Sequence, residues 1–337
     1  MTPGVVTQVM IVDILTLFPG HFISPLREGI LRRGIENGLI HIWIFNLRDF
    51  ACDQHRTVDD RPFGGGAGMV LKPEPIYRAL TWLKGLPGPR PRVIILTPQG
   101  TPLKQARVKE LMLCPRIILI CGRYEGVDER IADFFCDEQI SIGDYVLSGG
   151  EPAALVLLDT LIRLIPEVMG CADSGKEESF EEGLLEYPQY TRPRNFKGHG
   201  VPEILFSGDH EKIRTWRRRQ SLAKTIKRRP NLIEEDRLSP EDRKILRIFQ
   251  NQNVNDKNNA GDSKTSRCKA RKSRGMRRTI KVRRNKPAPA KIGEGRSAIP
   301  RNAGQMGVFQ TPVRKRSKDG CLDHVGKRAD AGGSSRL

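Results

Sequence analysis

The chain has 337 residues, 38% of them hydrophobic, and is long enough for about two domains with a substantial core. No apolar run reaches the ~20 residues of a membrane span, and no basic segment precedes the short apolar run near the N-terminus, so we expect neither a membrane protein nor a signal peptide. The seven cysteines form no CxxC pair and no metal-binding spacing. We therefore expect reduced thiols, a cytoplasmic protein and no metal site.

The net charge of +19 is concentrated in the last part of the chain. Residues 255–337 hold 23 basic and 6 acidic residues (+17), whereas residues 1–254 hold 35 and 33 (+2). A strongly basic balance is typical of proteins that bind nucleic acid, but here it describes the tail. Any RNA affinity of the folded part must come from local basic patches.

The first half of the chain alternates between apolar, β-rich runs and runs with helical spacing. Strands are expected at 9–17 and 39–45, on either side of a helix at 25–37 that ends at an Asn-Gly stop signal. The long polar loop at 49–69 has a length that in compact domains is usually functional or disordered. Further helices are expected at 72–84, 103–112, 127–134 and 152–165, and further strands at 93–97, 117–121 and 139–146. This alternation predicts an α/β fold with a parallel sheet.

The composition changes after residue 168. We expect an α/β domain at 1–168, a polar acidic interdomain linker at 169–186 and a small helical domain at 187–251. The helices of that small domain are expected at 209–229, which is strongly basic, and at 239–249. From residue 252 too few large apolar residues remain to offset the conformational entropy of the chain, so 252–337 is expected to be a disordered basic tail.

Three of the expected strands end in polar loops that contain glycine. These loops are TPQG (97–100), CGRYEGVDER (121–130) and SIGDYVLSGGE (141–151). In a parallel sheet such loops meet at one edge, where open α/β sheets bind ligands. A helix that begins directly after Gly149 and Gly150 would add free backbone N–H groups to this edge.

Two phosphate-binding motifs can be excluded. No GxGxxG follows the first strand, and the GGGAG at 64–68 has the wrong spacing for a dinucleotide site. GCADSGKE at 170–177 is close to a phosphate loop, but Glu177 stands where a Mg²⁺-binding hydroxyl is required, and Glu178 would repel phosphate.

Together with HRTVDDRPFGGGAGM (55–69), the second and third of these loops resemble the motifs of the bacterial tRNA (guanine-N1)-methyltransferases, of the SPOUT superfamily, over about residues 10–250. The resemblance implies methyl transfer from S-adenosylmethionine to N1 of guanosine 37, just 3′ of the anticodon in tRNA. It also implies a deep trefoil knot in the first domain and a homodimer whose active sites lie between the subunits. From the residues alone we would expect an unknotted, doubly wound sheet.

The resemblance places the cofactor in the three glycine-containing loops. Backbone amides and carbonyls can read the edges of an adenine there, and glycines let the backbone approach closely, although a purely structural role is the alternative for any one glycine. The residues carried over are Leu96, Thr97, Pro98, Gln99, Gly100, Gly122, Tyr124, Glu125, Gly126, Ser141, Ile142, Gly143, Asp144, Tyr145, Val146, Leu147, Gly149 and Gly150.

Methylation of guanine at N1 requires the loss of a weakly acidic proton, so a carboxylate must lie within hydrogen-bonding reach of N1. A cation near O6 would stabilise the negative charge that develops. By resemblance the base is Glu178, where the family has an aspartate, and the cation is Arg163. Glu177 or Asp173 could replace Glu178, or the linker could be a solvated acidic segment. The alternative role of Arg163 is an i,i+4 pair with Asp159.

Two sets of residues are expected to contact tRNA. By resemblance, the first set surrounds the target guanosine: His55, Asp59, Asp60 and Arg123. The second set lies on the basic helix: Arg214, Arg217, Arg218 and Arg219. No acidic residue occurs in this helix after Glu211. So many cations without an acid favour phosphate binding over a solvated charged face.

Two other functions stay open at this point. A ribose 2′-O-methyltransferase could have the same fold, and a protein could keep the fold and bind RNA without catalysis. The cofactor loops do not separate these functions. The linker carboxylate together with Arg163 favours methylation of the base.

Overall fold

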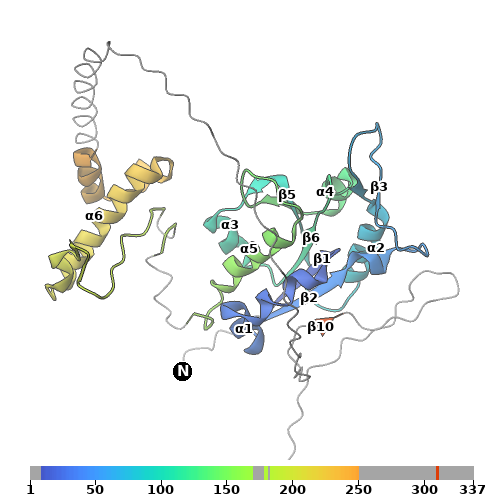
Figure 1. The fold of residues 1–337 in the computed structure, drawn as a ribbon, viewed down its shortest axis with the longest axis horizontal. Coiled ribbons are helices and arrows are strands. Elements are labelled where there is room, and N and C mark those ends of the chain that lie inside the picture. Colours follow the sequence, from blue (N-terminus) through green and yellow to red (C-terminus); the bar gives the residue numbers. More distant parts are fainter. Residues whose placement is uncertain (1–8, 170–177, 181–182, 250–308, 311–337) are drawn as a thin grey trace, which may run out of the picture. The chain divides into compact units, whose positions relative to one another are not determined.

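The computed structural model describes residues 9–169, 178–180, 183–249 and 309–310 (Figure 1). The chain divides into two compact units, Met1–Gly175 with Gln305–Leu337, and Lys176–Gly304. Within the described ranges, every helix is too short or too polar to span a membrane. The expected linker lies largely outside these ranges, as does all of the expected tail except residues 309–310.

The first unit is built on a parallel sheet. Its strands are β1 (Met10–Thr16), β2 (Ile40–Asn46), β5 (Arg92–Pro102), β6 (Arg116–Cys121), β7 (Glu138–Ser141) and the two-residue β10 (Phe309–Gln310). Their order is β10-β2-β1-β6-β5-β7, and each neighbouring pair is parallel. All six residues of β6, RIILIC, are buried, as is usual for a strand covered on both faces. The predicted α/β fold with a parallel sheet is confirmed.

Helices cover both faces of this sheet (Figure 1). They are α1 (Gly29–Glu36), α2 (Pro73–Lys84), α3 (Gln105–Leu111), α4 (Glu129–Phe135) and α5 (Glu151–Ile162). Successive residues of β6 point to opposite faces: Ile117 and Leu119 join a core with α1, α3 and α5, whereas Ile118 and Ile120 join a core with α2 and α4. The unit therefore has three layers, with two hydrophobic cores separated by the sheet.

Short elements complete this unit. They are the 3-10 helices η1 (Pro19–Phe22), η2 (Pro25–Arg27) and η3 (Leu47–Phe50), and the antiparallel strands β3 (Asp59–Asp60) and β4 (Val70–Leu71). The predicted helix at 25–37 is wrong in its first turn: η2 comes first, because Glu28 is extended and Gly29 has φ +59°. The predicted strand at 139–146 is wrong after Ser141, because Gly143 takes φ +152° and its carbonyl accepts the N–H of Tyr145.

The strand β5 is longer than the predicted 93–97. It pairs with β7 on both sides of a register shift that lies between Leu96 and Thr101. At Gly100, within the shift, a Cβ atom would lie 2.5 Å from the backbone of Gln139 and Ile140. Only glycine lets the two strands come this close.

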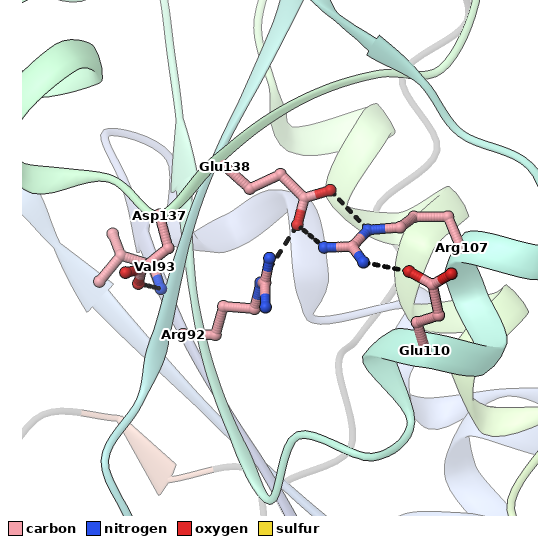
Figure 2. A network of polar contacts seen from close by, with 6 residues as sticks. All are labelled: Arg92, Val93, Arg107, Glu110, Asp137 and Glu138. Carbon is pink, nitrogen blue, oxygen red and sulfur yellow. Dashed lines mark hydrogen bonds and ion pairs between the residues drawn. The ribbon is translucent and has the colours of Figure 1, made fainter.

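Ion pairs join the edge strand β7 to β5 and α3 (Figure 2). Glu138 accepts hydrogen bonds from Nε of Arg92 (3.2 Å) and Nε of Arg107 (2.6 Å). The neighbouring Asp137 accepts the backbone N–H of Val93 (2.7 Å). These contacts fix the pairing at the start of both strands, before the register shift.

The central strands β1 and β6 are joined by a buried ion pair. Nε of Arg116 donates to Asp13 at 2.7 Å, and the two side chains are 1% and 0% exposed. Charges with so little solvent contact are stable only when they are paired. The pair therefore favours the observed register, in which Arg116 lies beside Ile11.

The second unit is mainly helical. Its longest element is α6 (His210–Arg228), whose N-cap Asp209 accepts the backbone N–H of Lys212 (3.0 Å), and residues 240–249 form a further helix. Its shorter elements are β8 (Asn195–Phe196), β9 (His199–Gly200), η4 (Glu203–Phe206), η5 (Pro230–Leu232) and η6 (Glu235–Arg237). Its buried core consists of Leu184, Leu222, Leu238 and Leu246. The helices predicted at 209–229 and 239–249 are confirmed.

The described cysteines Cys114, Cys121 and Cys136 are free thiols. The expectation of reduced thiols is confirmed at these three positions.

Candidate active site

A cavity of about 300 Å³ lies at the carboxyl edge of the sheet. Its walls are the middle of β5, where the register shifts, and the loops that follow β6 and β7, together with side chains from α4 and α5. The lining ranges are 95–99, 122–127, 139–143 and 145–150, with Glu129, Ala132 and Ala153. All of the residues expected to bind the cofactor line this cavity except Gly100 and Asp144. The structure thus brings together three segments that are far apart in the sequence.

The glycines of these loops have different roles. A Cβ atom on Gly150 would lie 2.7 Å from Cα of Cys121, and the N–H of Gly150 donates to the carbonyl of Gly122 (2.8 Å). Gly150 therefore brings the start of α5 against the end of β6. At Gly122 the nearest heavy atom to an added Cβ is a methyl of Val127 at 3.6 Å, so packing within the protein does not require glycine there.

A buried carboxylate, that of Glu151, connects three segments at this edge. It accepts a hydrogen bond from the hydroxyl of Thr16 at the end of β1 (2.7 Å) and one from Nε of Arg123 (3.0 Å). Thr16 and Glu151 are both 0% exposed. The guanidinium of Arg123 also donates to the carbonyl of Ser148 (3.1 Å) and lies 4.4 Å from the ring centre of Phe18. This network sets the shape of the loops that line the cavity.

Sequence reasoning did not single out Glu151. Arg123 was expected to contact the target guanosine, and it lines the cavity while it pairs with Glu151. The available signal was an acid directly after Gly150 at a helix start, where the helix dipole favours a negative charge.

The polar loop at 49–69 is anchored on the loop after β6. The carbonyl of Met69 accepts the N–H of Glu125 (3.0 Å), and the carbonyl of Gly126 accepts the N–H of Leu71 (2.9 Å). The expected tRNA contacts of this loop differ in exposure: His55 and Asp60 are exposed, and Asp59 is half-buried in β3. The loop is therefore continuous, through backbone hydrogen bonds, with the wall of the cavity.

The expected catalytic pair falls in two different units. Arg163 is the C-cap of α5 in the first unit, and its side chain is exposed. Glu178 is half-buried in the second unit. The alternatives Glu177 and Asp173 lie outside the described residues. Among the described residues, no cluster of three or more acids, histidines or cysteines could hold a metal ion.

The four arginines expected to bind tRNA on α6 have different surroundings. Arg218 pairs with Asp242, from Nε (3.1 Å) and from its terminal nitrogen (2.8 Å). The guanidiniums of Arg217 and Arg219 lie 4.7 Å and 5.8 Å from the ring centres of Tyr187 and Phe249. The side chain of Arg214 is exposed. Arg218 thus has a structural role, because it compensates a carboxylate that is almost buried.

The fold and the cavity define an α/β protein with a cavity at the carboxyl edge of a parallel sheet, the place where open α/β sheets bind ligands. The family model of tRNA (Guanine-1)-methyltransferase TrmD matches residues 10–235. The chain is 52% identical over 238 residues to the tRNA (guanine-N(1)-)-methyltransferase of Geotalea uraniireducens, with 71% of this chain and 96% of the relative covered. It is 51% identical over 239 residues to the enzyme of the same name from Pelotomaculum thermopropionicum, with 71% and 95% covered.

The chain belongs to this family and is a tRNA guanine-N1 methyltransferase. The names of these relatives specify a nitrogen of the base. The comparisons therefore favour methylation of the base over the two functions that the sequence alone left open, ribose methylation and RNA binding without catalysis.

The ion pair between Arg218 and Asp242 predicts an acid-dependent stability of the second unit. Burial acts to raise the pKa of Asp242, but the hydrogen bond and charge of Arg218 outweigh it, so the pKa lies below its usual 3.8. A lowered pKa gives stability that is present above pH 3.8 and is lost as the pH falls further. Asp242→Asn should therefore cost about 1–2 kcal/mol at pH 7 and should reduce the loss of stability between pH 5 and pH 2.

Urea unfolding followed by circular dichroism measures both effects. The control is Asp236→Asn, which changes an exposed aspartate of the same unit and should leave stability and its pH dependence unchanged. If wild type and Asp242→Asn lost the same stability between pH 5 and pH 2, the ion pair would not be the cause of the acid dependence.

Proposed function

We propose that the enzyme methylates N1 of guanosine 37 in tRNA, with S-adenosylmethionine held in the cavity at the sheet edge. The observation that carries the proposal is the convergence of the middle of β5 and the loops after β6 and β7 on one cavity, lined by all but two of the residues that the family resemblance assigns to the cofactor. Its volume of about 300 Å³ is at the lower end of the range for small-molecule sites.

The chemistry of the lining fits this cofactor. Leu96 and Ala153 supply apolar surface, and the backbone at Gly122 is open. Glu125 and Glu129 supply negative charge, which favours a sulfonium cation. When bound, S-adenosylmethionine would supply an electrophilic methyl group.

In this proposal two residues act on the guanine. Glu178 accepts the N1 proton, since a carboxylate base is required there and Glu178 stands at the position of the family's aspartate. Arg163 stabilises the negative charge that develops on O6. His55, Asp59, Asp60 and Arg123 hold the base, which is consistent with the attachment of the loop at 49–69 to the loop after β6 that contains Arg123.

Each active site would take residues from two chains. α5 begins at the cavity with Glu151 and ends just before Arg163. Its twelve residues span about 18 Å, far more than an arginine side chain covers. Arg163 is therefore too far from the start of α5 for its side chain to reach the cavity end of its own helix, which supports a homodimer in which Arg163 serves the active site of the partner subunit.

The path of the chain after β7 supports the trefoil knot. β7 lies at the edge of the sheet, with β5 between it and β6. The loop after β7 nevertheless returns past β5 to the loop after β6. There Gly149 forms an isolated β-bridge with Arg123, and the N–H of Gly150 donates to the carbonyl of Gly122. A knot at the carboxyl edge requires the chain to pass over a neighbouring strand in this way, here from β7 past β5 to the end of β6.

We further propose the domain organisation expected from the sequence, with the knotted cofactor domain at 1–168, the linker at 169–186 and the tRNA-binding domain at 187–251. The exposed Arg214 and the basic end of α6 support RNA binding by that domain. The basic tail at 252–337 would add charge that raises RNA affinity at low salt.

A side chain at Gly122 should reduce binding of the cofactor without loss of the fold. Gly122→Val places methyl groups in the cavity wall, where packing within the protein leaves room. We expect the affinity for S-adenosylmethionine, measured by calorimetry, to fall at least about tenfold while circular dichroism stays native. Gly20→Val is the control, because Gly20 has no neighbour within 4 Å of an added Cβ and lies outside the cavity. Unchanged affinity in Gly122→Val would place the cofactor elsewhere.

Mixing two inactive variants should restore activity if the site lies between subunits. Gly122→Val damages the cavity of its own chain, and Arg163→Ala removes the cation given to the partner. After subunit exchange, half of the dimers would be mixed and each would hold one intact site, so about a quarter of wild-type activity should return. The readout is methyl transfer at a cofactor concentration that saturates only the wild type. No recovery, with exchange demonstrated by tagged subunits, would contradict the shared site.

Glu178→Gln keeps the size and hydrogen-bonding capacity of the side chain but cannot accept a proton. Methyl transfer in single turnover should fall about 10²- to 10⁴-fold, while the affinities for tRNA and cofactor stay unchanged. Glu178→Asp restores the family residue and should retain much of the rate. If Glu177→Gln is inactive and the methyl-transfer rate of Glu178→Gln falls by less than about threefold, the base is Glu177 and not Glu178.

A further inference from the structure

A second cavity, of about 490 Å³, lies entirely within the second unit. One wall is the segment 187–194, another is α6, and the rest comes from Val201 and the end of η4. Its volume is within the range of small-ligand sites, and of its lining residues only Arg217 has been given a role above, as an expected tRNA contact.

The lining of this cavity combines aromatic rings with guanidinium groups. The rings of Tyr190 and Trp216 lie 6.5 Å apart at an angle of 48°. The guanidinium of Arg194 lies 4.1 Å from the ring centre of Phe206. Tyr190 and Phe206 are each 48% exposed, so part of each side chain is open to a ligand.

The charge of the lining is positive. Arg192, Arg194 and Arg217 contribute three guanidiniums, and the described residues that line the cavity include no acid. One carboxylate outside the lining, that of Glu203, pairs with Arg194 at 2.5 Å. An anionic or electron-rich planar ligand fits this environment better than a cation or an aliphatic chain.

The wall formed by the segment 187–194 is held in place by its N-terminal neighbours. The backbone N–H of Leu185 donates to Oγ1 of Thr225 (2.9 Å), and Nζ of Lys224 donates to the carbonyl of Glu186 (2.9 Å). Both contacts tie the chain just before Tyr187 to α6. Except for Phe206 of η4, the aromatic and guanidinium groups are thus presented by two elements that are hydrogen-bonded to each other.

We propose that this cavity receives an unstacked base of the substrate tRNA, one other than the guanine that is methylated. Proteins recognise RNA loops by stacking unpaired bases on aromatic side chains and on arginine planes, with cations on the adjoining phosphates. The lining offers both in one place. The proposal rests on the proposed function, since it takes tRNA as the ligand of this unit, and the methylated guanine must instead reach the cofactor cavity of the first unit.

The test replaces one ring at the mouth of the cavity in the full-length enzyme. Tyr190→Ala should weaken binding of a fluorescently labelled substrate tRNA, followed by anisotropy, about five- to hundredfold. The slope of affinity against salt should stay unchanged, because no phosphate contact is lost. Tyr190→Phe should bind as wild type, because stacking needs the ring and not the hydroxyl.

The matched control is Phe196→Ala, which removes an aromatic side chain that is 60% exposed on the same stretch of chain but lies outside the cavity. It should leave the affinity unchanged. Equal affinities of wild type and Tyr190→Ala would overturn the proposal, as would an equal loss in Phe196→Ala.

Methyl transfer by the wild-type enzyme to the same tRNA separates the two levels of the proposal. If the wild type methylates and Tyr190→Ala binds normally, the proposed function stands and the base-binding cavity is wrong. If the wild type neither binds nor methylates this tRNA, both fail. If Tyr190→Ala instead converts dimers to monomers in sedimentation while tRNA affinity per dimer is unchanged, the cavity holds a second copy of the chain, and the proposal is overturned.

Discussion

The carboxylate of Glu151 has no contact with solvent, and the carboxyl edge of the sheet depends on how that charge is compensated. Its partners come from the end of β1, through Thr16, and from the loop after β6, through Arg123. Removing one partner from a buried charge typically costs about 3–5 kcal/mol. The three segments are therefore held together by the requirement that one charge stay paired. The loop after β6 and the stretch just before α5 also line the cavity, so the pairing of this one charge contributes to the shape of the cavity as well as to the stability of the sheet edge.

The class of the fold could be predicted from the sequence, and the arrangement of its strands could not. Runs such as RIILIC in β6 predict strands buried on both faces, and their alternation with helices predicts a parallel sheet. A strand that is apolar on both faces has no pattern that specifies its neighbours, so the order β2-β1-β6-β5-β7 had to come from the structure. Tyr145 and Val146 imitate the end of a strand, but they are 54% and 86% exposed in a loop that Gly143 turns away from the sheet.

The candidate site shows the same division. Its loops could be identified because their motifs are long and specific. The role of each glycine could not be predicted. A close backbone contact requires glycine at position 150 but not at position 122, and only the structure shows this difference. The charges of α6 behave similarly: a sequence can count arginines, but it does not reveal that Arg218 compensates Asp242 while Arg214 faces solvent.

The helix α5 sets the distance between the cavity, which lies at its N-terminal end, and the exposed Arg163 that follows its last turn. A helix turns by about 100° and advances about 1.5 Å per residue. Inserting or deleting a single residue inside α5 would therefore rotate Arg163 onto another side of the helix, even if every core contact could be rebuilt. Substitutions on the exposed face of α5 leave this geometry intact. The length of α5, rather than the composition of its exposed face, therefore fixes where Arg163 lies relative to the cavity.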